Sequence, residues 1–250
     1  MAKKYLGIDV GGTGIKGALV NIDSGKLVHD KIRILTPSPA TPQSVAKAVK
    51  EIVNQVGIKD KMVGAGFPAI IKDGVSMSAA NIDKSWIGTS VKKVFSKATN
   101  CKFIIANDAD VAGVAEMRFG KGKGAKGTVI FLTLGTGIGS AVFNNGKLVP
   151  NTEFGHLKWG KGIAEHMVSY KVKKINNLSF KEWGKELNKF LQHIEFLFSP
   201  DLMILGGGGS KKFKEFSDML DLKCKVTPAA LLNDAGVIGA AALASEKDKS

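Results

Sequence analysis

What this chain has little of excludes several classes of protein. Only two of its 250 residues are cysteine, Cys101 and Cys224, and neither belongs to a CxxC pair, so neither a disulfide framework nor a cysteine-rich metal site can be built. Its most apolar stretch, TVIFLTLGTGIGSAVF, is interrupted by glycines and is shorter than the ~18 apolar residues that a membrane-spanning helix needs. The opening MAKKYLGIDV shows no signal-peptide pattern. We therefore expect a cytoplasmic protein with no membrane partner.

Aromatic residues are also few, at 7%, whereas positive charge is abundant. The 36 Lys and Arg side chains exceed the 22 Asp and Glu side chains, which gives a net charge of +14. Such an excess attracts polyanions, whether nucleic acid, anionic lipid or phosphate chains. Proteins that bind single-stranded nucleic acid alternate basic with aromatic side chains, and this sequence does not. We expect no nucleic-acid partner, and we retain a non-catalytic polyanion-binding protein as an alternative.

Apolar residues make up 44% of the chain and follow an α/β pattern. Alternating and helical periodicities predict strands over 5–10, 15–22, 26–35, 62–67 and 102–106, and helices over 42–56, 90–98 and 109–119. Thr41-Pro42 is a helix start, and Gly57 is its end. The Gly- and Lys-rich stretch 120–127 is the best candidate for a domain boundary.

The opening pattern returns after this boundary. GTGI at 12–15 recurs at 135–138, and GKLV at 25–28 recurs at 146–149. The repeat predicts a duplicated unit of three strands. Amphipathic stretches over 161–174 and 179–198, a buried strand DLMIL and a closing helix over 235–246 follow. We therefore expect two α/β lobes with a central cleft, formed by residues 1–119 and 120–233, with residues 234–250 packing back on the first lobe.

Three glycine-rich turns each follow an apolar strand. Without a Cβ atom, glycine lets backbone amides approach an anion closely, and a neighbouring hydroxyl adds another donor. None of the turns is a GxxxxGK[ST] loop, and each taken alone also fits a plain hairpin or a strand-to-helix turn. Together they predict a phosphate-binding site made of Gly11, Gly12, Thr13 and Gly14, then Gly135, Thr136 and Gly137, and then Gly207, Gly208 and Ser210.

Polar side chains near these turns suggest phosphoryl transfer. Asp9 lies where the first strand meets its turn, a position that suits Mg²⁺ held directly or through water, or a simple Asx cap. Lys16 reaches a phosphate oxygen or faces the solvent. Asp108 follows a buried strand and fits either a helix N-cap or a base that accepts a hydroxyl proton. The segment from Glu153 to His156 adds a carboxylate and an imidazole, as hydroxyl-rich ligands require.

These motifs resemble the ROK family of sugar kinases, within the actin-like (ribonuclease H-like) ATPase superfold, and most closely its polyphosphate glucokinase branch. The resemblance runs nearly end to end and rests on IDVGGTGIKG, AANIDKSWIG, NDADVAGVAEMRFG, LTLGTGIGSA, LVPNTEFGH and ILGGGGSKK. It implies that Asp108 is the catalytic base acting on the 6-hydroxyl of glucose. It also implies that the sugar hydroxyls bind Asn81, Asn107, Asp108, Glu153, His156 and Glu165.

The same resemblance implies Mg²⁺ as the cofactor and a homodimer as the assembly. Many ROK proteins hold zinc with the histidine of this motif and three following cysteines, but LKWGKGIAEHMVSY contains no cysteine, so we expect no zinc. The sequence begins directly at its first strand, so the helix-turn-helix of ROK repressors is not expected either.

The sequence must also be asked which phosphoryl donor it favours, a nucleotide or a phosphate chain. A nucleotide needs an apolar slot for its base, whereas a phosphate chain needs a row of cations. Lys211 and Lys212 follow the third turn, and further cations occur at Lys84, Arg118, Lys121, Lys123, Lys126 and Lys214. We expect inorganic polyphosphate as the main donor and ATP as a second one. A strictly ATP-dependent glucokinase or another hexose kinase is the alternative.

Overall fold

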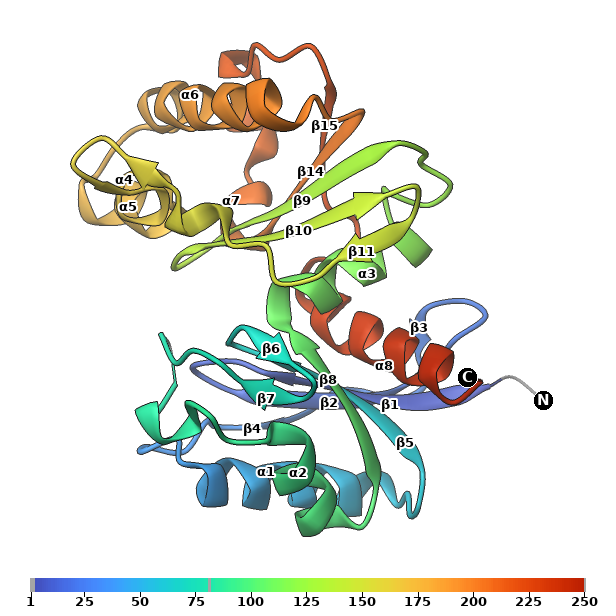
Figure 1. Cartoon of the computed structure of the whole chain (residues 1–250). Helices are drawn as coiled ribbons and strands as arrows, with labels where there is room; N and C mark the ends of the chain where they lie inside the picture. Colours follow the sequence, from blue (N-terminus) through green and yellow to red (C-terminus); the bar gives the residue numbers. More distant parts are fainter. Residues whose placement is uncertain (1–2, 81, 250) are drawn as a thin grey trace. The chain divides into compact units, whose positions relative to one another are not determined.

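The computed structural model describes residues 3–80 and 82–249, which form two compact units (Figure 1). The first unit contains the chain up to Ala115 together with the chain from Asp234 onward. The second unit is Glu116–Asn233. No helix within the described residues is long and apolar enough to cross a membrane.

The sheet of the first unit has the order β3-β2-β1-β5-β8, with β4 also paired to β2. Strands β1, β5 and β8 are parallel, so their carboxyl ends lie at one edge. The expectation of one strand over 26–35 is wrong: β3 and β4 are separate pieces, because the polar residues between them leave the sheet and Lys31 pairs with Asp234. The strands are β1 (Lys4–Val10), β2 (Ile15–Asn21), β3 (Lys26–Leu27), β4 (Ile32–Ile34), β5 (Met62–Phe67) and β8 (Lys102–Asn107).

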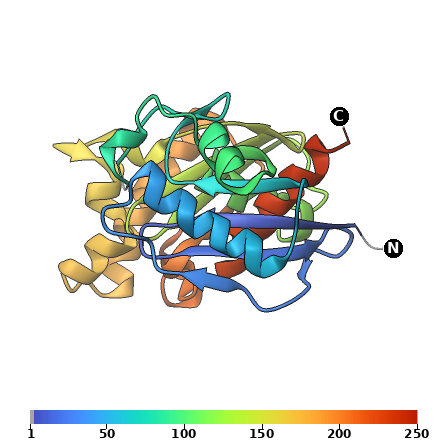
Figure 2. The same ribbon diagram turned by 90° about the horizontal axis from the view of Figure 1, so that it is seen from below.

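Helices α1 (Pro42–Val56) and α2 (Val91–Thr99) cover one face of this sheet, and α8 (Ala235–Lys247) covers the other (Figures 1 and 2). The predicted ends of α1 are confirmed: the Thr41 side chain accepts a hydrogen bond from the Ser44 amide, and Gly57 ends the helix with a φ of 72°. The short strands β6 (Ile71–Lys72) and β7 (Val75–Ser76) and the 3₁₀ turn η1 (Lys84–Trp86) lie between β5 and α2 in the chain.

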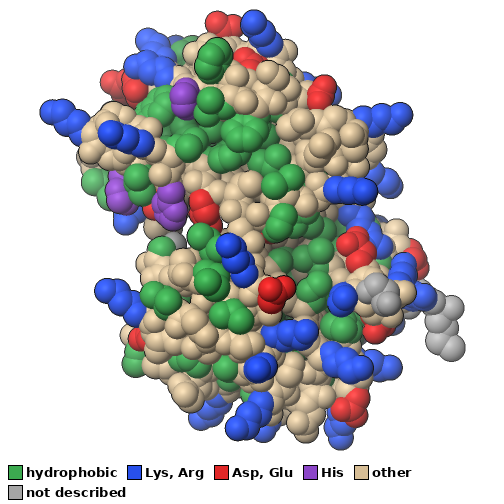
Figure 3. Space-filling view, viewed as in Figure 1, with side chains coloured by type: hydrophobic (Ala, Val, Ile, Leu, Met, Phe, Trp, Pro, Cys, Tyr) green, Lys and Arg blue, Asp and Glu red, His purple; other side chains and the backbone are tan. Residues whose placement is uncertain are grey.

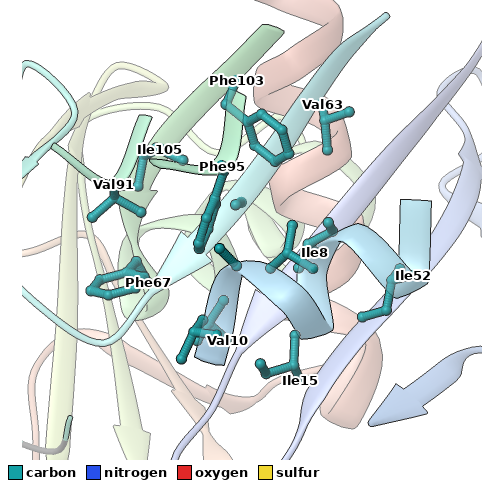
Figure 4. Close-up of a cluster of buried hydrophobic side chains, with 14 of the residues drawn as sticks. Ile8, Val10, Ile15, Ile52, Val63, Phe67, Val91, Phe95, Phe103 and Ile105 are labelled. Atoms are coloured by element: carbon teal, nitrogen blue, oxygen red, sulfur yellow. The ribbon is translucent and has the colours of Figure 1, made fainter. Parts of the chain in front are cut away.

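A core of aliphatic and aromatic side chains fills the space between the sheet and α1 and α2 (Figure 4). Phe67, Trp86, Phe95 and Phe103 make edge-to-face contacts in it. On the opposite face, α8 lies directly on the strand backbone, because a Cβ atom at Gly64 would overlap the Ala240 carbonyl group. This packing holds the carboxyl ends of β1, β5 and β8, which carry the candidate site, in a fixed geometry.

The second unit repeats the topology of the first. Its sheet has the order β11-β10-β9-β14-β15, in which each strand corresponds to one of β3-β2-β1-β5-β8, so the predicted duplication of the first three strands is confirmed. The strands are β9 (Thr128–Leu134), β10 (Ile138–Asn144), β11 (Lys147–Val149), β14 (Leu202–Gly206) and β15 (Lys225–Pro228). A hairpin, β12 (Lys158–Trp159) and β13 (Gly162–Ile163), follows β11 in the chain.

One of the two amphipathic stretches predicted for the second unit does not form a single helix. Stretch 161–174 is not one element: it contains part of the hairpin and then α4 (Ala164–Val168) and α5 (Tyr170–Ile175), separated by Ser169. Helix α6 (Phe180–Phe198) begins with a capping box between Ser179 and Glu182. The short α7 (Gly207–Ser210) and the 3₁₀ turns η2 (Phe154–His156), η3 (Phe213–Glu215), η4 (Ser217–Met219) and η5 (Leu232–Asp234) complete the elements described.

The glycine-rich stretch after α3 (Asp108–Phe119) is wound around one buried carboxylate, that of Glu116. One Glu116 oxygen accepts a hydrogen bond from the Lys121 amide at 2.9 Å, and the other accepts from the Leu231 amide at 2.7 Å. A Cβ atom at Gly120 would overlap this carboxylate, which explains the glycine there. Glu116 therefore joins the two segments at which the chain leaves and approaches the first unit.

Candidate active site

Asp9 lies at the carboxyl end of β1, beside the first residues of α8. Its carboxylate oxygen is 3.5 Å from the Lys16 ammonium nitrogen, and a Cβ atom at Gly236 would lie 2.7 Å from the Asp9 Cγ atom. The N-terminal end of a helix stabilises a nearby negative charge. Asp9 accepts no hydrogen bond from the turn that follows it, so the Asx-cap interpretation is wrong, and so is an outward-facing Lys16. The partly exposed carboxylate keeps lone pairs for a cation.

The first glycine turn projects its tip into the solvent. Gly11 donates its amide to the Gly14 carbonyl oxygen at 3.2 Å, and the Thr36 hydroxyl donates to the Gly11 carbonyl oxygen. Gly12 and Thr13, at the tip, are exposed. These contacts fix the turn from behind and leave its tip accessible to a ligand.

The sequence analysis missed Arg33 at this turn. Its guanidinium Nε atom would lie 2.9 Å from a Cβ atom at Gly14, and Arg33 is the register partner of Lys16, which in turn pairs with Asp9. Three charged side chains therefore occupy adjacent strands at the same level of the sheet. The pairing of β4 with β2 was the missing information, because the sequence predicted one long strand there.

Asp108 is the first residue of α3, directly after β8. The helix is capped by its neighbour: the Asn107 side-chain oxygen accepts from the Ala109 and Asp110 amides at 2.8 and 3.3 Å, and its nitrogen donates to the Ala69 carbonyl oxygen at 3.2 Å. Asn107 therefore provides the cap that the sequence analysis had offered to Asp108, while the Asp108 carboxylate accepts from the amide of the next residue, Ala109, at 2.8 Å. Buried Asn107 fixes the start of α3, and half-buried Asp108 lies at the same edge of the sheet as Asp9. Asn81 lies outside the described residues.

In the second unit, Glu165 packs directly on the second glycine turn. Its Oε2 atom accepts from the Ile138 amide at 3.3 Å, and a Cβ atom at Gly137 would overlap the carboxylate. Gly135 donates its amide to the Gly137 carbonyl oxygen at 3.0 Å, and Thr136 at the tip is exposed. The exposed-helix interpretation of Glu165 is therefore wrong.

Glu165 belongs to a cluster of two carboxylates and two imidazoles. His156 lies between the carboxylates, at 3.8 Å from Glu153 and 3.7 Å from Glu165, and His166 is 3.8 Å from Glu165. Imidazoles and carboxylates are visible on this face of the second unit in Figure 3. The sequence analysis did not single out His166, although His166 follows Glu165 directly in the chain. Within the described residues, no group of three or more His, Cys, Asp or Glu side chains is placed to hold a metal ion.

Burial raises the pKa of Glu153 above its ordinary value, while the nearby His156 opposes this effect and Glu165 adds to it. The loop is held by Ser140, whose hydroxyl donates to the Thr152 carbonyl oxygen at 2.6 Å and accepts from the Phe154 amide at 2.9 Å. A half-buried carboxylate in a loop held in this way is costly for folding, but its oxygens can accept hydrogen bonds from the hydroxyl groups of a ligand.

We expect Glu153→Gln to stabilise the fold at neutral pH. Because the folded-state pKa is raised, the wild-type carboxyl group contributes stability below its unfolded pKa of about 4.5 and loses that contribution as the pH rises through the folded pKa. Glutamine has no such charge. The melting-temperature difference in favour of the variant should therefore grow as the pH rises from about 4.5 to 8. A difference independent of pH would contradict this, and Glu186→Gln, at an exposed position of α6, is the control.

The third glycine turn is the short helix α7, after β14. Gly207 has a φ of 77° and packs against the Leu134 backbone, which places this turn beside the second one. The buried Ser210 hydroxyl donates to the Gly207 carbonyl oxygen at 2.9 Å, so it acts inside the turn. Lys211 is exposed, whereas Lys212 is 2.9 Å from Glu215, an interaction that raises the pKa of Lys212.

Comparison with known proteins identifies the family. The model of the ROK family matches residues 5–163. The polyphosphate glucokinase of Mycobacterium tuberculosis is 48% identical over 94% of this chain and 89% of its own length. The polyphosphate glucokinase of Mycobacterium leprae is 46% identical over 97% of this chain and 74% of its own length.

A solved structure agrees with this result. The inorganic polyphosphate/ATP-glucomannokinase of Arthrobacter sp. strain KM superposes with a TM-score of 0.92 at 45% identity, covering 98% of this chain and 99% of that one. The α/β fold is that of the actin-like ATPases to which the ROK sugar kinases belong. Because the family model covers more than half of the sequence, and close relatives cover nearly all of it, we conclude that this chain is a member of the ROK family.

Proposed function

We propose that this protein transfers the terminal phosphoryl group of inorganic polyphosphate to the 6-hydroxyl of glucose, with ATP as a second donor. The observation that carries this proposal is the likeness, over nearly the whole chain, to proteins named polyphosphate glucokinase and polyphosphate/ATP-glucomannokinase. The glycine turns and the carboxylates at the strand ends supply the groups that such a reaction needs. We propose that the protein acts in the cytoplasm.

In the proposed reaction, the Asp108 carboxylate accepts the proton of the 6-hydroxyl as that oxygen attacks the terminal phosphorus atom. The new bond joins the sugar oxygen to phosphorus, and the bond from phosphorus to the bridging oxygen breaks. The products are glucose 6-phosphate and a polyphosphate one unit shorter, or ADP. Asn107 positions Asp108 by capping α3. The protein's main contributions are the placement of the acceptor and the neutralisation of charge.

The remaining site residues form two groups, one that binds the sugar and one that binds the phosphate groups. We propose that the sugar hydroxyls bind Asn81, Asn107, Glu153, His156 and Glu165, because carboxylates accept from hydroxyls and an imidazole both donates and accepts. The phosphate groups bind the first turn with Lys16, the second turn, and the third turn through Gly207, Gly208, Lys211 and Lys212. Ser210 supports this last turn from inside.

Asp9 fits a magnesium ion. Mg²⁺ is commonly held by one or two carboxylates, several water molecules and substrate phosphates, and Asp9 offers one partly exposed carboxylate beside the first phosphate turn. A bound Mg²⁺ would neutralise charge on the phosphoryl donor. Lys16 supplies a second positive charge at the same place. The resemblance to the family further implies a homodimer, which sedimentation or light scattering would test.

The proposal is tested by measuring glucose 6-phosphate formation at equal low concentrations of ATP and long-chain polyphosphate. We expect the rate with polyphosphate to be higher. The variant Lys211→Ala/Lys212→Ala should raise the KM for polyphosphate, mainly through Lys211, because Glu215 already neutralises Lys212 in part.

Each alternative predicts a different result. Preference for ATP would overturn polyphosphate as the main donor and favour an ATP-dependent hexose kinase. Absence of product with both donors would favour the polyanion-binding protein. An unchanged KM in the double variant would show that these two lysines take no part in donor binding.

A further inference from the structure

Helix α5 carries a run of lysines that neither the sequence motifs nor the proposed function uses. The run is Lys171, Lys173 and Lys174, and Lys171 and Lys174 are exposed. No acidic side chain of the described residues lies within ion-pair distance of these three lysines, in contrast to Lys212, which is held by Glu215. Unpaired lysines close together repel one another, so an anion that lies between them is favoured.

Helix α5 packs against the second and third glycine turns, which are the two turns of the second unit that we propose bind the phosphoryl donor. The Lys171 amide donates to the Gly135 carbonyl oxygen at 3.0 Å, and Cβ atoms at Gly208 and Gly209 would lie 3.7 and 3.2 Å from the Tyr170 ring. Gly207 packs against the backbone of Leu134, the last residue before the second turn. The two turns and the start of α5 therefore pack against one another, with Lys171, Gly207 and Gly208 exposed.

Aromatic rings fix two of the lysine heads on this surface. The Lys174 ammonium lies 4.8 Å from the centre of the Tyr170 ring, and the Lys173 ammonium lies 4.2 Å from the centre of the Phe180 ring. Such cation–π contacts restrict side chains that would otherwise move freely. Positive charges held in this way attract a chain of phosphate groups.

We infer that α5 extends the donor site, and that Lys171 and Lys174 bind phosphate groups of a long polyphosphate chain beyond its reacting end. This inference rests on the proposed function. Only a chain long enough to occupy the glycine turns and α5 together would gain these contacts. Because the additional binding is intramolecular, affinity should rise with chain length while the chemical step stays unchanged.

The test compares Lys171→Ala/Lys174→Ala with a matched control, Lys147→Ala/Lys225→Ala. The control removes the same charge from exposed positions on β11 and β15, the two edge strands of the same sheet. Glucose 6-phosphate formation is measured with long-chain polyphosphate, tripolyphosphate and ATP at several salt concentrations, and binding of long-chain polyphosphate is measured without glucose. The charge-conserving Lys171→Arg/Lys174→Arg variant completes the set.

We expect the α5 alanine variant to raise the KM for long-chain polyphosphate about tenfold or more, since each charge-assisted contact contributes severalfold. Its KM for tripolyphosphate and ATP should stay within about twofold of wild type, its kcat should not change, and the arginine variant should recover binding. The salt dependence of long-chain binding should also become less steep.

Two results would overturn the inference. One is an equal effect of the α5 and control variants, which would show that only net charge matters. The other is an equal loss for all three donors, which would place α5 at the reacting end. Failure of the proposed function is seen separately, in a wild-type protein that forms no product from polyphosphate; direct binding then still decides whether α5 holds the chain.

Discussion

Replacement of Asp108 by asparagine is expected to lower the kcat of glucose phosphorylation about 100- to 10,000-fold. Asparagine has nearly the same shape but cannot accept the proton of the 6-hydroxyl, and the cap of α3 is retained because Asn107 provides it. Folding and glucose binding should therefore persist. Steady-state rates with polyphosphate, together with a glucose-induced shift in melting temperature, measure the two effects separately.

Asp73→Asn is the control for this variant. Asp73 is exposed and has a φ of 51°, a conformation that asparagine tolerates, so its replacement should leave both rate and binding unchanged. Turnover of Asp108→Asn near the wild-type rate would show that Asp108 is not the base. Loss of the glucose-induced shift would instead show that Asp108 is needed for sugar binding.

Replacement of Glu116 by alanine should lower the free energy of unfolding by about 3–5 kcal/mol, because two amides lose bonds to a buried charged acceptor. Glu116→Gln keeps one acceptor oxygen and should lose about half as much. Chemical denaturation measures both values. Hydrogen exchange at the Lys121 and Leu231 amides should accelerate in the alanine variant.

Glu186→Ala is the matched control, since Glu186 is half-exposed on α6 and pairs only with Lys189. Exposed ion pairs contribute at most about 1 kcal/mol, so this variant should unfold nearly as the wild type does. A Glu116→Ala protein as stable as Glu186→Ala would mean that the glycine-rich stretch does not depend on the carboxylate. The proposal that Glu116 holds residues 120–127 in place would then be wrong.

The parts of the fold that could be predicted are those that depend on local pattern. Thr41, Pro42 and Gly57 fix the ends of α1 through contacts within a few residues, and alternation of apolar residues defines the strands. The repeat of GTGI predicted the second set of three strands because strand and turn signals return in the same order. These features need no knowledge of distant residues.

The candidate site was predictable in its residue types but not in its contacts. Asn107 and Asp108 are both good caps, and only the structure shows that Asn107 takes this role. Gly137 is needed because Glu165, far along the chain, packs against it. Glu116 lies in a helix and gave no signal, since its partner Leu231 is over one hundred residues away.

The duplication has a consequence for the charge on the strand pair that leads into each glycine turn. Strand positions equivalent to Asp9 and Lys16 are occupied in the second unit by Thr133 and Gly139, which pair with each other as Asp9 and Lys16 do. The Thr133 hydroxyl accepts a hydrogen bond from the Gly139 amide at 3.0 Å, so this copy is neutral. The strand pair that leads into the first turn therefore carries an aspartate and a lysine, whereas the one that leads into the second turn carries only a hydroxyl and an amide. Two substitutions in an internal repeat have thus left the same backbone hairpin with an ion pair in one copy and with a neutral hydrogen bond in the other.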